Sequence, residues 1–473
     1  MPNSSGCALN LADIQGFILR GYHTPFVRHY ILRIENGAAA KQLLGGLATA
    51  DDEFMHITDA RPWLNGKPDY CLNVGLTHTG LSRLMNTNDI EFPGRNIADQ
   101  RDAFKEGAVA AAPWVGDTGQ SAPEYWWDEL GTDKIHVVFS LYSTDLAVRA
   151  KKSEILQQAF SENNAFSVTK IHDGASFPGD LIHFDYKDGI AQPQIEDAPG
   201  LPHPDCQPQV QSWQFILQQV DMSGHFPENP HCTYQLNTET QKALLLNGSF
   251  AAFRVMQQDV VGFEQYLDQH KDIIDPELLA AKLCGRWRDG SPLVLDPDHK
   301  INVAPNDINN FDYYKADPHG DRCPVGSHIR RSNPRNQPIR GSAGGDGRGT
   351  RNHRIIRRGM PYGPQYVPGS GDDGIERGLM VMFICADLAN QYEFILKDWV
   401  QQGDFASGGP AGKDPLIGTV DGHEGGVFET TDKNGEPTVL KDLPQFVRTR
   451  GCAYLFLPSL KGLKHIAEAD LPG

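Results

Sequence analysis

The order of strand-like and helix-like segments constrains the fold of this chain more than any other feature, because the same alternation occurs in both halves. Runs rich in β-branched and aromatic residues predict strands, and the periodic segments between them predict helices. In the first half, the predicted strands are residues 27–34, 70–76 and 135–142, and the predicted helices are residues 38–47, 79–85 and 144–160. Alternation of this kind predicts an α+β domain in which helices cover a sheet.

The second half repeats the alternation after a segment of different composition. Residues 196–245 are rich in Pro, His, Asp and Gln, which is typical of a connector. Beyond it, residues 249–257, 378–386 and 451–458 predict strands, and residues 260–270, 276–286 and 390–401 predict helices. Since a chain of this length holds about two to four domains, we expect an N-terminal domain over residues 1–205, a connector over 206–245 and a C-terminal domain over 246–473.

The overall composition narrows the class of protein. The formal net charge of -17 disfavours a broad nucleic-acid surface, because phosphate contacts need clustered Lys and Arg. No apolar run reaches the roughly 18 residues that span a bilayer. Residues 1–15 show no secretion signal, so we expect a cytoplasmic protein without membrane or nucleic-acid partners. The 8 cysteines include no CxxC pair and are expected to be reduced thiols, not a zinc site or a disulfide framework.

Three segments carry residues capable of chemistry, although each alone has an ordinary explanation. Segment 323–335 reads CPVGSHIRRSNPR and places His328 beside small residues and two arginines. Segment 183–193 reads HFDYKDGIAQP, and its Asp-Gly pair is usually a solvated turn. Segment 353–363 reads HRIIRRGMPYG and fits the basic end of a strand. The glycine-rich residues 338–352 lack the Lys-Ser/Thr of a phosphate-binding loop, so a surface insertion is expected there.

Taken in this order, the three segments resemble the motifs of the dye-decolorizing peroxidases. That family has a Gly-x-x-Asp-Gly motif, a proximal histidine shortly before Asn-Pro-Arg, and a distal arginine ahead of Met-Pro-aromatic-Gly. The resemblance runs from residues 13–16 (DIQG) to the closing segment 450–458, and the chain length is similar to that of the larger bacterial members. It implies two ferredoxin-like domains, each an antiparallel sheet backed by helices, with haem held in the C-terminal half.

The resemblance implies a role for each matching residue. His328 is expected to ligate the haem iron, with Asp414 as the hydrogen-bond partner of its second ring nitrogen. Asp188 is the expected acid–base catalyst, and Arg357 is expected to stabilise charge on peroxide, with Arg358 as the alternative. Three more residues are expected at the cofactor, each with a structural alternative: Arg330 at a propionate or an acidic side chain, and Val381 and Phe383 in the pocket wall or in the core.

One position departs from the family pattern. The first glycine of Gly-x-x-Asp-Gly is Asp185 in this chain, so a second carboxylate lies three residues before Asp188. If Asp185 faced the pocket, one of the two acids would have its pKa raised by the other. We expect Asp185 to point outward instead.

The implied function is that of an oxidoreductase that uses one haem b (heme b) per chain to reduce hydrogen peroxide and oxidise bulky aromatic or phenolic donors such as dyes. A haem carrier or sensor on the same scaffold, without turnover, is one alternative, and a haem-free α+β interaction protein is another. The pair Asp188 and Arg357 favours the enzyme, because a carrier has no use for an acid–base catalyst beside the iron. The long insertions are plausible places for subunit contacts in a homo-oligomer.

Overall fold

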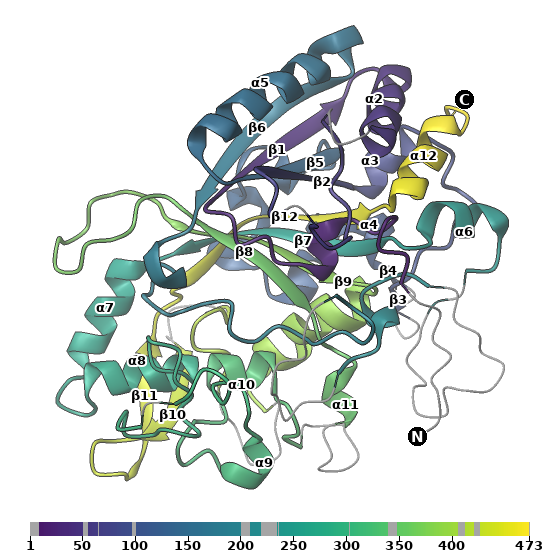
Figure 1. The fold of residues 1–473 in the computed structure, drawn as a ribbon. Helices are drawn as coiled ribbons and strands as arrows, with labels where there is room; N and C mark the ends of the chain where they lie inside the picture. Colours follow the sequence, from purple (N-terminus) through teal and green to yellow (C-terminus); the bar gives the residue numbers. More distant parts are fainter. Residues whose placement is uncertain are drawn as a thin grey trace.

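The computed structural model describes residues 9–50, 55–64, 66–96, 101–199, 209–218, 234, 236–301, 303–338, 348–404, 412–420 and 426–472. Its centre is an eight-stranded antiparallel sheet with the strand order β6-β1-β5-β2-β12-β7-β9-β8 (Figure 1). The first half of the chain contributes β1 (Phe26–Ile34), β2 (Tyr70–Leu76), β5 (Val137–Ser143) and β6 (Phe166–Ala175). The second half contributes β7 (Ser249–Gln258), β8 (Ile356–Tyr362), β9 (Gly378–Cys385) and β12 (Val447–Leu457).

The two halves of the sheet meet at β2 and β12, and the outermost strands also approach each other. Phe456 pairs with Leu76 in the ladder between β12 and β2. At the outer edges, β6 contacts β8. Gly174 of β6 makes this contact possible, because a Cβ there would lie 3.1 Å from the carbonyl oxygen of Pro361 in β8. The sheet therefore curls until its edges meet, and one apolar core is shared by both halves.

The helices gather in two groups (Figure 1). In the view of Figure 1, α2, α5 and α12 lie along the N-terminal strands, whereas α7, α8 and α10 lie beyond the C-terminal strands. The α-helices are α1 (Gly16–Leu19), α2 (Gly37–Thr49), α3 (His78–Ser82), α4 (Ala103–Val115), α5 (Leu146–Ser161), α6 (Glu239–Leu245), α7 (Val260–Gln269), α8 (Pro276–Cys284), α9 (Tyr313–Ala316), α10 (His328–Ser332), α11 (Arg348–Arg351) and α12 (Leu460–Glu468). In two further two-stranded sheets, β3 (Arg95–Asn96) pairs with β4 (Arg101–Asp102) and β10 (Gly426–Thr431) pairs with β11 (Pro437–Leu443).

The structure confirms the predicted strands and helices of both halves, with shifts of a few residues at their ends, and adds others. The strand β8 lies in segment 353–363, which was interpreted only as the basic end of a strand because it contains two arginines and Pro361. A proline is tolerated here since β8 is an edge strand, where one side of the backbone needs no N–H donor. The strand β6, the hairpin of β10 and β11, and α12 were not expected. The predicted helix at 390–401 is present as two π-helical segments, Leu388–Glu393 and Ile395–Val400.

The predicted connector and insertion differ in how much of them the structure describes. Within 206–245, the helix α6 starts with a capping box, in which the Thr238 hydroxyl accepts from the Gln241 N–H and the Gln241 side chain accepts from the Thr238 N–H. Residues 339–347, the middle of the predicted surface insertion, lie outside the described residues. The domain limits 1–205 and 246–473 stay predictions.

The two faces of the C-terminal half of the sheet belong to different apolar clusters. Successive side chains along a strand point to opposite faces. On β9, Met380 and Met382 are buried in the main core, whereas Val381 belongs to a second apolar cluster together with Met256 of β7. This second face, which we call the pocket face, carries every other residue of β7, β8 and β9 and forms one wall of a cavity.

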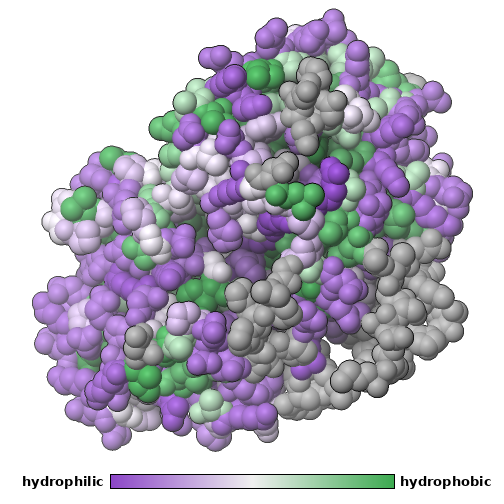
Figure 2. All heavy atoms as spheres, in the orientation of Figure 1, coloured by the Kyte–Doolittle hydropathy of each residue, from purple (hydrophilic) through white to green (hydrophobic). Residues whose placement is uncertain are grey.

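Hydrophilic side chains dominate the face of the molecule drawn in Figure 2, with apolar residues scattered among them. Among the described residues, no helix has the length and apolar character needed to cross a membrane. Five of the cysteines are buried free thiols: Cys71, Cys284, Cys323, Cys385 and Cys452.

Candidate active site

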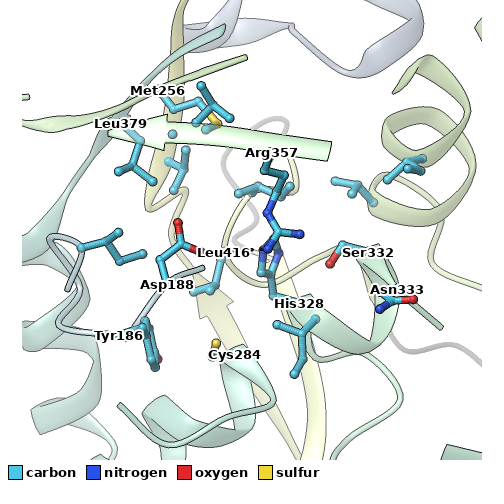
Figure 3. A pocket seen from close by; sticks show the side chains of 18 of the residues that line it. Tyr186, Asp188, Met256, Cys284, His328, Ser332, Asn333, Arg357, Leu379 and Leu416 are labelled. Atoms are coloured by element: carbon cyan, nitrogen blue, oxygen red, sulfur yellow. Dashed lines mark ion pairs between the residues drawn. The ribbon is translucent and has the colours of Figure 1, made fainter. Parts of the chain in front are cut away.

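A cavity lies between the pocket face and the segments opposite it (Figure 3). The opposite side is built by the turn around Asp188, the end of α8, the helix α10 and the segment that follows Asp414. Five residues predicted from the sequence line this cavity: Asp188, His328, Arg357, Val381 and Phe383. The fold therefore brings together residues from four segments of the chain: the turn of Asp188, α10, β8 and β9.

His328 is the first residue of α10. The preceding residue, Ser327, is fully buried, and its hydroxyl donates to the carbonyl oxygen of Lys282 in α8. This bond fixes the start of α10 against α8. The imidazole of His328 is partly exposed to the cavity, and its Nδ1 lies 2.9 Å from Oδ2 of Asp414. Asp414 is thus placed where the sequence predicted it, beside His328.

The charge state of Asp414 determines which ring nitrogen of His328 donates a hydrogen bond to it. Burial by itself raises the pKa of the Asp414 carboxyl, but the charge of His328 and the hydrogen bonds that the carboxylate accepts lower it below its ordinary value. Oδ1 accepts the N–H groups of Leu416 and Ile417 at 2.9 and 3.0 Å. An ionised Asp414 can only accept, so Nδ1 of His328 donates. When the imidazole is neutral, Nε2 then carries the lone pair that a ligand in the cavity can use.

Asp188 and Arg357 form a second polar group in the cavity. Nη2 of Arg357 lies 4.0 Å from Oδ1 of Asp188, and the two side chains are 34% and 46% exposed. Nη2 also donates to the carbonyl oxygen of Ala191 at 3.2 Å. Asp188 comes from a turn and Arg357 from β8, and Figure 3 shows both side chains extending into the same space.

Gln192 ties this turn to the edge strand β8. Its side-chain Nε2 donates to the carbonyl oxygen of Arg357, and its Oε1 accepts the Arg357 N–H, both at 3.1 Å. The amide thus satisfies backbone groups that the outer edge of a sheet otherwise leaves open. Sequence reasoning did not assign Gln192 a role, although its position directly before a proline, four residues after Asp188, is a usable signal.

Arg358 points to the opposite face of the sheet. Its Nε donates to the carbonyl oxygen of Phe17 at 2.7 Å and its Nη2 to that of Ile18 at 3.2 Å. Removal from water is the largest influence on its guanidinium and lowers the pKa to about 10. Neighbouring residues of a strand face opposite ways, so only Arg357 of the pair reaches the cavity.

The assignment of Arg330 to a cofactor propionate is wrong. Arg330 is fully buried and does not line the cavity. Its Nη1 donates to Oδ2 of Asp317 at 2.9 Å, and its Nη2 donates to the Asp317 carbonyl oxygen and to Gln337. Two residues along a helix correspond to a rotation of about 200°, so Arg330 leaves α10 on the side opposite to His328.

Two other buried arginines line the cavity instead, Arg286 and Arg335. Nη1 of Arg286 donates to the carbonyl oxygens of Gly290 and Ile308, each at 2.8 Å. Both guanidiniums donate to Oδ1 of Asn309, so two positive charges lie close together. Burial, followed by smaller effects that include the charge of Arg335, lowers the pKa of Arg286 to about 10. Sequence reasoning missed both, although Arg335 ends the quoted segment 323–335.

Asp185 lies outside the cavity lining, as expected. Its backbone has a φ of 60°, the left-handed conformation that glycine adopts without strain and that Asp tolerates better than most residues. Its carboxylate lies 3.8 Å from Nη1 of Arg288, on the outer side of the turn. Burial raises the pKa of Asp185 above its ordinary value, and Arg288 opposes that rise.

The set of groups around the cavity fits a haem. An imidazole whose Nε2 faces the cavity, and whose other ring nitrogen is hydrogen-bonded to a carboxylate, is a usual iron ligand in haem proteins. The apolar side chains of Leu379, Val381 and Phe383, all on β9, offer a flat apolar wall. Two guanidiniums in one region suit the carboxylates of the propionates.

Comparison with known proteins agrees with this reading of the fold. The family model described as "DyP dimeric alpha+beta barrel domain" matches residues 13–176. A dye-decolorizing peroxidase of Mycetinis scorodonius is 29% identical over 98% of this chain and 88% of its own. A multifunctional dye peroxidase of Amycolatopsis is 26% identical over 97% of this chain and 96% of its own. A solved dye-decolorizing peroxidase in complex with 2,6-dimethoxyphenol matches 97% of this chain and 100% of its own, with a TM-score of 0.79 at 24% identity, a likeness of fold. The predicted α+β fold is thereby confirmed.

Proposed function

We propose that this chain, which is similar to dye-decolorizing peroxidases over nearly its whole length, is a peroxidase that uses haem b to reduce hydrogen peroxide and oxidise aromatic or phenolic donors. The observation that carries this proposal is one cavity lined by His328, which pairs with the buried Asp414, and by Asp188 with Arg357. The first pair supplies an iron ligand, and the second supplies an acid–base group with a cation beside it. A protein that only stores or senses haem has no need of the second pair.

His328, Arg286 and Arg335 would hold the cofactor. Nε2 of His328 would bind the iron, and the two guanidiniums would donate to the propionate carboxylates. A bound haem would supply the two electrons that reduce peroxide and the oxidising power that acts on donors. Asp414 keeps Nδ1 of His328 protonated and the ring oriented, which makes the imidazole a stronger donor to iron.

Asp188 and Arg357 would handle the protons and charge of peroxide. Breaking the O–O bond of hydrogen peroxide to release water requires that one oxygen lose a proton and the other gain one. The Asp188 carboxylate takes the first proton and returns it to the leaving oxygen. The guanidinium of Arg357, 4.0 Å from Asp188, stabilises the negative charge that develops meanwhile.

Aromatic donors are supported by the relatives and by the wall of the cavity. The solved relative in complex with 2,6-dimethoxyphenol binds a phenol, and the relatives from Mycetinis scorodonius and Amycolatopsis are named for action on dyes. The cavity that Asp188 and Arg357 line also carries apolar side chains, among them Ile182 and Leu379. Small phenols would approach there.

Spectroscopy and turnover test the proposal together. The haem-loaded protein should show a Soret band and the pyridine haemochrome spectrum of haem b, and it should oxidise 2,6-dimethoxyphenol only when hydrogen peroxide is present. A Soret band without peroxide-dependent oxidation would indicate a carrier or sensor. Failure to bind haem at all would indicate a haem-free interaction protein.

A further inference from the structure

The turn that presents Asp188 depends on a residue about one hundred positions away in the chain. The N–H of Asp188 donates to the carbonyl oxygen of Asp180, and the N–H of Lys187 donates to the carbonyl oxygen of Arg288, both at 2.9 Å. The Asp188 side chain itself is 46% exposed. A side chain with so much exposed surface has few neighbours to hold it, so its position depends on how the turn is anchored.

The side chain of Arg288 also contacts this turn, in addition to its backbone carbonyl. Nη1 donates to the carbonyl oxygen of Phe184 at 2.8 Å and lies 3.8 Å from Oδ2 of Asp185. Nη2 donates to Oε1 of Glu264 in α7 at 2.8 Å, and Nε lies 3.1 Å from Oε2 of Glu277 in α8. The arginine is only 17% exposed, so these contacts are partly shielded from water.

Arg288 therefore contacts the turn on both sides of Tyr186. Its backbone holds Lys187, next to Asp188, and its guanidinium holds Phe184 while lying over the Tyr186 ring at 5.8 Å. Tyr186 in turn donates from its hydroxyl to the carbonyl oxygen of Ala280 in α8 at 2.7 Å. The guanidinium of Arg288 thus connects the helices α7 and α8 to the turn.

We propose that Arg288 is a positioning residue for Asp188: it sets where the carboxylate of Asp188 stands relative to Arg357 without contacting peroxide or cofactor. The Asp185 carboxylate adds a contact to Arg288 that the glycine of the family motif cannot make. The inference rests on the acid–base role proposed for Asp188, and the experiment below distinguishes failure of one from failure of the other.

The test measures the bimolecular rate of reaction with hydrogen peroxide by stopped-flow mixing, with the haem-loaded full chain. Arg288→Gln removes the charge and the fork of donors. We expect a loss of about tenfold, smaller than the ~10²-fold that a misplacement of 1 Å can cause. The haem content and Soret spectrum should stay those of the wild type, because His328 and Asp414 are not contacted by Arg288.

A double-mutant cycle separates positioning from a general structural effect. If Arg288 acts through Asp188, then Arg288→Gln should lower the rate less than about twofold when Asp188→Asn is already present, since coupled residues are non-additive. The same tenfold loss in both backgrounds would overturn the inference. Wild-type rate in Arg288→Gln would also overturn it, while leaving the role of Asp188 intact. An unchanged rate in Asp188→Asn would instead overturn the proposed acid–base role.

Two further variants complete the design. Arg28→Gln breaks a similar forked ion pair with Asp173, with both bonds at 2.7 Å, on strands remote from the cavity lining, and should leave the rate unchanged. If Arg288→Gln does not fold, Glu264→Gln weakens the anchor on α7 at a more exposed site and should lower the rate about threefold, by partial loss of the same positioning. A wild-type rate in Glu264→Gln, together with an unfolded Arg288→Gln, would overturn the inference.

Discussion

Asp414 Oδ2 lies 2.9 Å from Nδ1 of His328, and the carboxylate is completely buried. The two residues are 86 positions apart in the chain. Asp414 is itself fixed by the N–H groups of Leu416 and Ile417, so it orients the imidazole instead of following it. The direction in which His328 presents Nε2 is therefore a property of the segment that follows β9, not of α10 alone.

His328→Ala should lose haem. Without the imidazole, the cofactor keeps only its contacts with the apolar wall and the two arginines, which bind no iron. We expect the purified variant to carry a small fraction of the wild-type haem content, measured by the pyridine haemochrome assay. Full haem content together with normal peroxidase activity would show that another residue is the axial ligand.

Asp414→Asn should leave haem bound but raise the reduction potential of the iron. The amide cannot hold a negative charge against Nδ1, so the imidazole donates less to iron. Spectroelectrochemical titration measures the potential. Asp317→Asn is a matched control, since it removes a buried carboxylate that pairs with Arg330 and not with His328. An equal potential change in both variants would contradict a specific role for Asp414.

Arg357→Leu should slow the reaction with peroxide by roughly 10²-fold or more, by analogy with loss of one charge-stabilising donor. Arg358→Leu should leave that rate within about twofold of the wild type, because Arg358 points to the other face of β8. It should instead lower the free energy of unfolding, on the order of 1–3 kcal/mol, by leaving carbonyl oxygens unpaired. A reversal of the two rates would exchange the roles of the two arginines.

Asp188→Asn should slow the reaction with peroxide by at least about 10²-fold, the usual contribution of an acid–base group. Its Soret spectrum should be nearly that of the wild type, because Asp188 is not an iron ligand. Asp185→Asn should change the rate far less, since Asp185 faces Arg288 outside the cavity. A greater loss in Asp185→Asn would mean that the other carboxylate of the turn carries the proton.

Asp185 should also affect stability in a pH-dependent way. Its pKa in the folded protein is raised, chiefly by burial, so the folded state binds this proton more tightly than the unfolded state. The stability contributed by Asp185 therefore falls as the pH rises from its ordinary pKa of about 3.9 through the raised value. Asp185→Asn should be more stable than the wild type at pH 7 and equal to it below about pH 3.9. Thermal unfolding at both pH values measures this, and a less stable variant at pH 7 would show that attraction to Arg288 outweighs burial.

Much of the site could be predicted because its chemistry lies in short local motifs. His328, Asp188 and Arg357 each stand in a segment whose neighbours are informative by themselves. The core strands β5, β7 and β9 were predicted for a related reason: buried strands need β-branched and aromatic residues, whatever they pair with. An exposed edge strand has no such requirement, which is why the segment of β8, with two arginines and a proline, indicated no more than the basic end of a strand.

The amino-acid sequence by itself determined which side chains are available for chemistry and where most strands and helices form, because these depend on residues close together in the chain. Only the tertiary structure decided the partners: Arg330 with Asp317, Arg286 beside Arg335, and Arg288 with the turn of Asp188. Arginines in one local sequence context can bind a cofactor, a buried acid or a backbone carbonyl with equal ease. Which of these they meet depends on the packing of segments that are far apart in the chain, and a local motif contains no information about that.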